Sequence, residues 1–354
     1  MSWTKQKIES KLHEKLSKDF LESPSDVDKF YGYYTSARDL LISDNIYKDI
    51  KFIQKDLSDH GEDHIMDVMR YAEKLLGNEI EDLHAIQIYF ICMLILFHDV
   101  GNLTVDRMRH HEQDVIREIY DYIRGRKREF DEERILVPEV ASKHSGTASD
   151  GSKDTINELS ILPPHLFGCE IYSKKSAALL RFADELAEGP HRTSIFMNKY
   201  YNYPYSQNSI IYHKYAEITK TNVDRQNERI CLTYNFSIQA NKGVISEKTH
   251  VEFIDLFRFT IGRMLKLEAE RKYCKYYCDW LSPFKKTHVT FNFLIENIDD
   301  ERSKAIRIDP GISELFLDDL TLPVGENPDK FFSHNNKYSP EEVYNSIKIE
   351  FNGK

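Results

Sequence analysis

The feature that most constrains the fold of this chain is a long apolar stretch that ends at two ionisable residues. From Ile86 to Phe97 only Gln87 interrupts the apolar run, and His98 and Asp99 follow it directly. A helix that is apolar nearly all round belongs in a protein core. The run is too short for a membrane span, which needs about 20 apolar residues. We therefore expect the central helix of a soluble domain, with a His-Asp pair at its end.

The size and charge of the chain limit the classes of protein it can be. Its 354 residues suffice for a principal domain with a continuous apolar core and smaller appendages. The formal net charge of −10 excludes a protein whose whole surface attracts polyanions, although a local basic rim is compatible with it. The five cysteines are odd in number and form no C-x-x-C pair, which is typical of free thiols in a reducing cytosol. With no signal-like leader at the start, a cytoplasmic protein is expected.

Helical patterns dominate the first half of the sequence. Between residues 3 and 20 apolar side chains recur every four residues, and a second helix is expected to begin at Ser25 or Asp26. The segment from Ser145 to Pro164 lacks helical spacing and is expected to be a long loop, a kind of segment that is often functional in a compact domain. The other helices expected up to Ala187 span roughly residues 47–57, 62–76, 82–98, 110–127, 132–144 and 171–187.

The composition changes after Arg192. Tyrosine-rich and β-branched runs at 200–212, 216–219 and 229–234 favour strands, as does a later run at 288–295. The pattern predicts a mainly α protein with an appended, smaller α+β C-terminal region. The expected divisions are N-terminal helices in 1–46, a principal helical domain in 47–199, and a C-terminal region in 200–354 with strands at about 200–240, a long helix at about 246–281 and a tail at 285–354.

Histidine is concentrated in the helical block, where residues 60–191 hold nine of the 14 in the chain. His98 and Asp99 would be costly to bury alone at the end of an apolar helix, and metal coordination offsets that cost. An isolated pair would be explained by Asp99 capping backbone donors, but further donor clusters favour a site for Zn, Mn or Fe. Those clusters are Asp59-His60-Gly61-Glu62-Asp63-His64, Arg109-His110-His111-Glu112, Lys143-His144 and Ala183-Asp184-Glu185-Leu186.

Two histidines lie one helical turn apart where the helix 62–76 is expected to begin. His60 and His64 could therefore face the same way. Val68, Tyr71 and Leu75 continue the apolar stripe of His64, which predicts that His64 points inward as a metal ligand. His60 stands at the helix start, where one interpretation is a partly exposed residue near the cap.

The ordered set of donors resembles the HD superfamily of metal-dependent phosphohydrolases over roughly residues 55–195. In that family a helix-borne His, a His-Asp pair and a distal Asp follow one another, and here they correspond to His64, His98-Asp99 and Asp184. The resemblance implies an HD-type helical domain with Asp184 as a metal ligand. It also implies a second role for His60, in proton donation or phosphate contact, and both interpretations of His60 stay open.

Two further histidines decide between one metal ion and two. The binuclear branches of the HD family carry two extra histidines between the His-Asp pair and the distal Asp. The resemblance favours His111 over His110, because His111 directly precedes Glu112, and it adds His144, with Asp99 as a bridge between the ions. We expect two divalent ions, chosen from Mn, Fe, Zn and Mg. The alternative is a single ion with these histidines around it.

The chemistry of such a site follows from its charge. Divalent ions lower the pKa of bound water and polarise a phosphoryl oxygen. Side chains then position and neutralise the substrate, and the candidates are Lys143, Arg192 and His191, with Asp99 and His60 nearest the reaction.

The expected function is hydrolysis of a phosphoester or phosphoanhydride, with a nucleotide or nucleotide-like molecule as the leading substrate class. One alternative is a single-strand nuclease of the HD type. Such a nuclease would have a basic channel, and its affinity for nucleic acid would fall steeply with salt. Another is a nucleotide-binding sensor that passes its state on through residues 200–354. No membrane partner is expected, and a homo-oligomer is compatible with the sequence.

Overall fold

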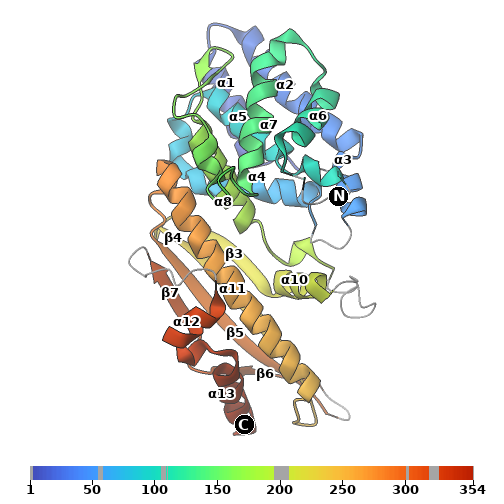
Figure 1. Ribbon diagram of the computed structural model, residues 1–354, viewed down its shortest axis with the longest axis vertical. Helices are drawn as coiled ribbons and strands as arrows, with labels where there is room; N and C mark the ends of the chain where they lie inside the picture. Colours follow the sequence, from blue (N-terminus) through green and yellow to red (C-terminus); the bar gives the residue numbers. More distant parts are fainter. Residues whose placement is uncertain are drawn as a thin grey trace. The chain divides into compact units, whose positions relative to one another are not determined.

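The chain folds into two compact units in its computed structural model, which describes residues 3–54, 59–104, 109, 111–194, 207–299, 303–318 and 327–353. The first unit comprises Met1–Ala187 with Tyr273–Ser282, and the second comprises Glu188–Lys272 with Pro283–Lys354. The first is helical and the second combines helices with a sheet (Figure 1). The predicted fold class, mainly α with an appended α+β region, is confirmed. The domain limits expected at residues 47 and 200 stay predictions.

The first unit is built from eight long helices and several short 3-10 turns in its described residues. The helices expected from sequence periodicity are confirmed, with ends shifted by a few residues. The elements are α1 (Lys7–Asp19), α2 (Pro24–Ser43), α3 (Ile46–Ile53), α4 (Glu62–Leu76), η1 (Gly77–Glu81), α5 (Ala85–Phe97), η2 (Val100–Leu103), α6 (Gln113–Arg124), η4 (Arg128–Phe130), α7 (Asp131–Ala141), η5 (Ser142–His144), η6 (Thr155–Glu158), the β1 (His165–Leu166) and β2 (Cys169–Glu170) hairpin, α8 (Ser173–Leu186) and η8 (Asp279–Leu281).

Helix α5 forms the centre of the first unit, as its apolar sequence predicts. Every residue of α5 is buried, and α1, α2, α4, α7 and α8 pack around it. The stretch Ala85–Leu103 is apolar and long enough to pass for a membrane span, but 94% of it is buried inside the protein, as in a core helix. The apolar run therefore forms the central helix of this core, and the other helices pack around it.

Both ends of α5 are fixed by side chains. At its start the imidazole of His84 accepts a hydrogen bond from the amide of Ile86 (3.2 Å), which satisfies one of the free donors of the first turn. Near its end the hydroxyl of Tyr47 on α3 donates to the carbonyl of Leu96 (2.9 Å). The bond from Tyr47 holds the last turn, from which His98 and Asp99 emerge.

A buried ion pair ties α6 and α7 to α5. The guanidinium of Arg124 lies 2.9 Å from the carboxylate of Glu133, and both side chains are almost completely buried. The hydroxyls of Tyr89 and Tyr120 donate to the same carboxylate at 2.6 and 2.8 Å. Since every oxygen of Glu133 has a partner, the desolvation cost of the pair is offset by hydrogen bonds.

The second unit holds a five-stranded sheet with one long helix between parallel strands. Strands β4 and β5 pair in parallel, β3 pairs with the free side of β4, and β6 and β7 share the other side of β5. The elements are η7 (Pro190–Arg192), α10 (Gln207–Ile218), β3 (Thr219–Asp224), β4 (Arg229–Asn241), α11 (Glu247–Tyr277), β5 (Lys286–Ile298), β6 (Ser303–Ile308), β7 (Glu314–Asp318), α12 (Pro328–His334), η9 (Asn336–Tyr338) and α13 (Pro340–Asn352). Helix α11 supplies the crossover that parallel pairing of β4 and β5 requires, and its last residues, from Tyr273, belong to the first unit.

Alternating burial along β4 and β5 forms the core of the second unit. Every second side chain is buried on both strands, which is the pattern of a sheet with one covered face. Phe236 and Phe293 stack across the two strands with ring centroids 5.4 Å apart, and Phe257 of α11 lies 5.4 Å from Phe236. Cross-strand aromatic pairs of this kind stabilise a sheet beyond the area they bury.

One part of the expected strand region is helical. The runs predicted as strands at 210–212 and 216–219 form α10 up to Ile218, and the strands begin only at Thr219. Buried positions Ser209, His213 and Ala216 follow one another at helical spacing. The β-branched and aromatic residues there pack from a helix, so tertiary packing overrides their strand propensity. Residues 200–206, also predicted as strand, lie outside the described residues.

Candidate metal centre

His98 is oriented as a metal ligand by the helix that carries it. It forms the C-cap of α5 and is completely buried. Its Nδ1 lies 2.8 Å from the carbonyl oxygen of Ile95. Because a carbonyl only accepts, Nδ1 carries the proton, and in the neutral ring Nε2 presents a lone pair. This Nε2 is buried without a hydrogen-bond partner, which is costly unless a cation fills the space before it.

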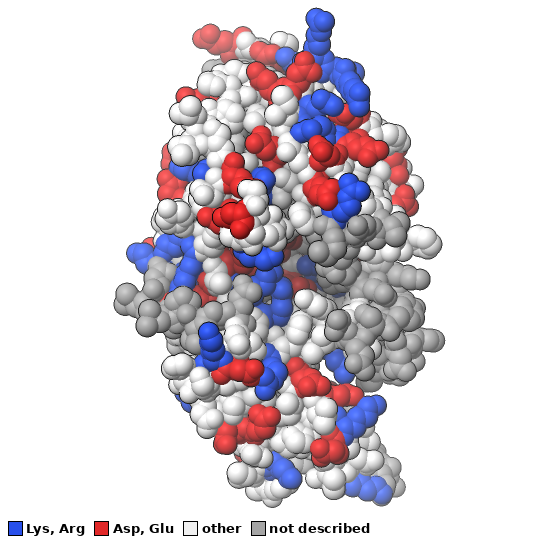
Figure 2. Space-filling view, in the orientation of Figure 1, with Lys and Arg blue, Asp and Glu red and all other residues white. Residues whose placement is uncertain are grey.

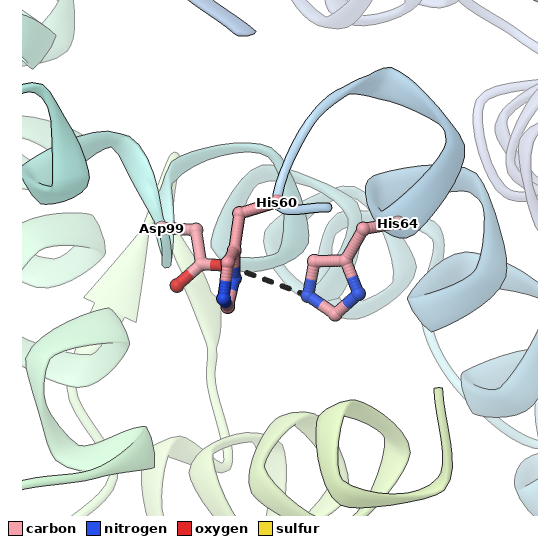
Figure 3. A group of neighbouring side chains, drawn as sticks. All are labelled: His60, His64 and Asp99. Atoms are coloured by element: carbon pink, nitrogen blue, oxygen red, sulfur yellow. Dashed lines mark hydrogen bonds and ion pairs between the residues drawn. The ribbon is translucent and has the colours of Figure 1, made fainter. Parts of the chain in front are cut away.

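Three imidazoles converge on one oxygen of Asp99. Its Oδ2 lies 2.8 Å from Nδ1 of His60, 3.3 Å from Nε2 of His64 and 3.4 Å from Nε2 of His98. His64 lies in the first turn of α4 and His60 lies two residues before the helix, and both point toward Asp99 (Figure 3). The predicted inward direction of His64 is therefore observed, and His60 joins it.

The other oxygen of Asp99 faces different partners. The side-chain amide of Asn102 donates to Oδ1 at 3.1 Å, and Nε2 of His144 lies 3.8 Å from the same atom. Nδ1 of His144 lies 2.7 Å from the carbonyl of Ala141, so His144, like His98, carries its proton on Nδ1 and directs Nε2 at the carboxylate. Asp99 therefore has a histidine nitrogen near each of its two oxygens.

Asp184 completes the donor set from the last helix of the unit. It lies on α8, near the end of the helix, and its Oδ1 is 3.1 Å from Nε2 of His64 and 3.8 Å from Nε2 of His98. Two groups could each hold an ion, with all ligand atoms of a group within 4.8 Å of one another: His60, His64 and Asp99, and His64, His98 and Asp184. The nitrogen and oxygen donors in these groups suit Zn, Mn or Fe.

The charges of the site are set by burial and by the histidines. Burial alone would raise the pKa values of Asp99 and Asp184, but the neighbouring imidazoles outweigh it and hold both pKa values well below the ordinary range. Burial, followed by the repulsion of His98, lowers the pKa of His144 to about 4. The centre therefore offers anionic carboxylates and a neutral His144 at neutral pH, which are the protonation states that bind metals.

His111 lies beside the loop that follows His144. A Cβ built on Gly146 would come within 2.5 Å of Cδ2 of His111, and Gly146 has a φ of +93°, so glycine is required there for both reasons. Among the described residues, neither group of donors that could share an ion includes His111 or His144. Their roles at a second ion stay predictions. The alternative ligand His110 lies outside the described residues.

The two cationic residues predicted to contact phosphate both have acidic neighbours. Nζ of Lys143 lies 2.7 Å from Oε2 of Glu158, and the guanidinium of Arg192 lies 3.6 Å from Glu188. Arg192 and His191 belong to the second unit. Their assignments as substrate contacts therefore stay predictions.

The loop that follows His144 is held to the end of α11 inside the first unit. Oδ1 of Asp154 accepts hydrogen bonds from the hydroxyls of Tyr273 and Tyr277, at 2.9 and 2.7 Å. The hydroxyl of Tyr273 also accepts a bond from the amide of Ile156 (3.1 Å), and the guanidinium of Arg181 lies 4.5 Å from the Tyr273 ring. These contacts fix the segment that leads away from His144.

Sequence reasoning missed one residue that orients the centre. Asn102 is nearly completely buried and holds Oδ1 of Asp99 from the next turn of the chain. The sequence signal that could have identified Asn102 is its position three residues after Asp99, as the polar residue among Val100, Gly101 and Leu103. Such partners direct a ligating carboxylate and tune its charge.

The chain matches the model of a known protein family. A family model described as HD-CE covers residues 54–256, more than half of the 354 residues, and it extends beyond the region 55–195 in which the sequence resemblance was expected. The matched range includes every donor described above. No curated protein and no solved structure matches the chain.

Proposed function

Because this chain belongs to the HD-CE family, we propose that it is a metal-dependent phosphohydrolase that acts on a phosphoester or phosphoanhydride. The proposed substrate class is a nucleotide or nucleotide-like molecule. The proposed ligands are His64, His98, Asp99 and Asp184 at one ion, with His111 and His144 sharing Asp99 at a second. The family membership supports the HD-type scaffold, and the donor geometry supports the metal.

One observation carries the proposal more than any other. In both His98 and His144, Nδ1–H donates a hydrogen bond to a backbone carbonyl. In both, Nε2 faces the carboxylate of Asp99. A neutral imidazole lone pair that faces a carboxylate oxygen is repulsive unless a cation lies between them. Because the pKa of His144 is lowered to about 4, its Nε2 carries no proton at neutral pH, and a proton cannot be that cation. A divalent metal ion fits both contacts.

When bound, divalent ions would lower the pKa of a coordinated water and polarise a phosphoryl oxygen. Asp99 would hold the ions through its two oxygens, while Asn102 keeps the orientation of the carboxylate. Nδ1 of His60 lies 2.8 Å from Oδ2 of Asp99, which places the ring beside the carboxylate at the centre of the site. Its side chain is 18% exposed, more than that of His64 or His98, which suits contact with a substrate. These roles make His60 the proposed proton-transfer residue.

The charge of a phosphate substrate requires compensation beyond the metal. Lys143 and Arg192 are the proposed residues for this purpose. In the structure Lys143 pairs with Glu158, whose pKa the Lys143 hydrogen bond helps lower to about 2. A phosphate group that binds there would have to compete with Glu158 for the ammonium. Replacing Glu158 with glutamine should therefore tighten phosphate binding if Lys143 has the proposed role.

The test is a substrate panel on metal-loaded protein. Purified protein stripped with a chelator and reloaded with Mn, Fe, Zn or Mg is incubated with nucleoside mono-, di- and triphosphates, dinucleotides and labelled single-stranded DNA and RNA. We expect phosphate or nucleotide release from a small nucleotide substrate, and its loss in the His98→Ala/Asp99→Ala double variant. The matched control is His165→Ala, which removes an exposed histidine of the same unit.

The same panel separates the alternatives. On the face drawn in Figure 2, Lys and Arg of the described residues are interspersed with Asp and Glu rather than gathered in one basic channel, which gives no support to a nuclease. Cleavage of the single strands alone would replace the proposal with nuclease activity. Tight nucleotide binding without turnover for any of the four metals would replace it with a sensor.

A further inference from the structure

A lysine in the loop after His144 has no acidic partner. Nζ of Lys153 donates hydrogen bonds to the hydroxyl of Thr147 (3.1 Å) and to the carbonyl oxygen of Gly146 (3.4 Å). Both partners are neutral, and within the described part of the chain no carboxylate forms an ion pair with this ammonium. Neutral acceptors orient an ammonium group but leave its positive charge uncompensated. Because Lys153 is also exposed, its charge is accessible to an anion.

The three acidic side chains of the same loop have partners of their own. Oδ1 of Asp150 accepts a hydrogen bond from the amide of Ser152 (2.8 Å). Asp154 accepts bonds from two tyrosine hydroxyls of α11, and Glu158 lies 2.7 Å from the ammonium of Lys143. The carboxylates of the loop therefore act on neutral donors and on the other lysine, not on the exposed one.

The backbone of Lys153 is fixed to helix α8. Nη1 of Arg181, a buried residue of α8, donates to the carbonyl oxygen of Lys153 (3.4 Å) and to the hydroxyl of Thr155 (3.1 Å). The Thr155 hydroxyl in turn donates to the carbonyl oxygen of Lys143 (2.8 Å), the residue that precedes His144. A buried arginine therefore ties Lys153 both to α8 and to the segment that carries His144.

A tight turn returns the chain from the loop tip to the beginning of the loop. The amide of Ala148 donates to the carbonyl oxygen of Ser152, and the amide of Gly151 donates to the carbonyl oxygen of Ala148, both at 2.9 Å. Gly151 has a φ of +83°, a conformation that glycine adopts without strain. The turn places Lys153 where its side chain reaches the carbonyl of Gly146.

Gly146 links this lysine to the metal centre. It stands two residues after His144, and a Cβ built on it would come within 2.5 Å of Cδ2 of His111. His111 and His144 are the histidines proposed at the second ion. Since Nζ of Lys153 contacts the carbonyl of Gly146, the ammonium lies at the side of the site that these two histidines form.

Ser145 supplies a hydroxyl without a partner at the same side of the site. It follows His144 directly, and its Oγ is buried with no hydrogen-bond partner among the described residues. A buried hydroxyl in this state is costly. A bound oxyanion would give the hydroxyl the acceptor that it lacks.

We propose that Lys153 and Ser145 bind a phosphate group of the substrate on the His144 side of the metal centre. The ammonium supplies a point charge and the serine supplies a hydroxyl donor, and both suit phosphate oxygens. Lys153 holds only neutral partners, so a phosphate group does not have to displace a carboxylate from it, as it would from Lys143. The inference rests on the proposed function, which makes phosphate the ligand, and it adds two residues to those proposed there.

The test uses inorganic phosphate as the probe. The full chain loaded with Mn is titrated with phosphate by calorimetry, and the Mn content of the same samples is measured. Lys153→Met should weaken phosphate binding by about tenfold with unchanged Mn content, and Lys153→Arg should retain most of the affinity because it retains the charge. Ser145→Ala should weaken binding by about fivefold. The matched control is Lys48→Met, which removes an exposed lysine of the same unit whose ammonium also has a neutral partner, Asn45.

The two readouts separate this inference from the proposed function. Unchanged phosphate affinity in Lys153→Met, or an equal loss in Lys48→Met, would overturn the inference and leave metal-dependent hydrolysis in place. Loss of Mn in Lys153→Met would also overturn it, because the lysine would then support the metal centre rather than the phosphate. Unchanged affinity in Ser145→Ala would overturn the part assigned to the serine. If the unaltered protein binds no Mn, the proposed function fails and the inference fails with it.

Discussion

Nε2 of His144 lies 3.8 Å from Oδ1 of Asp99, while the imidazoles of His60, His64 and His98 approach the other oxygen of the same carboxylate. Asp99 thus has three histidines at one of its oxygens and one histidine at the other. One carboxylate can bind two ions, one at each oxygen. The positions of the four histidines around Asp99 support the proposed binuclear centre. The ligands of each ion can be tested separately.

Loss of His144 should remove one ion and leave the other. Nε2 of His144 lies beside Oδ1 of Asp99, whereas the two donor groups found among the described residues do not include His144. His144→Gln is therefore expected to bind one equivalent of Mn or Fe where the unaltered protein binds two, as measured by mass spectrometry of the metal after desalting. His165→Ala should keep both equivalents. Retention of two ions in His144→Gln would show that His144 is not a ligand.

The metal-free protein should lose stability as the pH falls from about 6.5 to 4. The pKa of His144 is lowered from 6.5 to about 4 in the folded state, so the unfolded chain binds the proton first in this window. Stability then rises with pH across the window, by about 2 kcal/mol between pH 5 and pH 7. The lowered pKa values of Asp99 and Asp184 affect the free energy of unfolding at lower pH than this window.

The measurement is urea unfolding in EDTA at several pH values. His144→Gln should show a flatter dependence between pH 5 and pH 7 than the unaltered protein. An equally steep dependence in the variant would assign the titration to another group.

The buried pair Arg124–Glu133 should be essential for the helical unit. Glu133→Gln leaves the guanidinium of Arg124 buried without its charge partner, and we expect the free energy of unfolding to fall by about 3–5 kcal/mol. Asp114→Asn is the matched control, because it breaks an exposed pair with Arg117 on the same helix, α6. Chemical denaturation of both variants checks the expectation. A similar small loss in both would mean that the buried pair contributes specificity rather than stability.

Removing one hydroxyl from α11 should loosen the loop after His144. Tyr273→Phe keeps the ring beside Arg181 but deletes the bonds with Asp154 and Ile156, each worth about 1 kcal/mol. Amide hydrogen exchange in residues 145–158 should become faster, and metal affinity at the His144 side should fall with it. Tyr276→Phe is the control, since the Tyr276 side chain is 82% exposed. Unchanged exchange in Tyr273→Phe would show that the loop is fixed by other contacts.

The parts of the fold that were predictable are those in which one chemical pattern dominates. The apolar run before His98 predicted a buried central helix, which the structure contains, and His98 and Asp99 are buried together at its end. His64 was predictable because its apolar stripe continues along α4. Asp184 is different: on α8 it has no local feature that distinguishes it from a surface acid, and only the family resemblance identified it.

The failures came from residues whose structure depends on distant partners. The segment 210–218 has strand-like composition, yet Tyr215 and Ala216 are buried from a helix. Asn102 escaped notice because its importance comes from a single bond to Asp99 that no spacing rule reveals. The role of Lys143 at the substrate stays a prediction, and the sequence could not show that Glu158 would lie 2.7 Å from its ammonium.

The most direct test of the metal centre is a crystal structure of the protein grown with Mn and recorded at the Mn absorption edge. The account predicts anomalous peaks within bonding distance of both oxygens of Asp99, one also contacting His64, His98 and Asp184 and the other also contacting His144. A single peak at the first position would reduce the centre to one ion. The absence of any anomalous peak beside Asp99, in crystals that bind Mn elsewhere or not at all, would contradict the proposal that this site holds a metal.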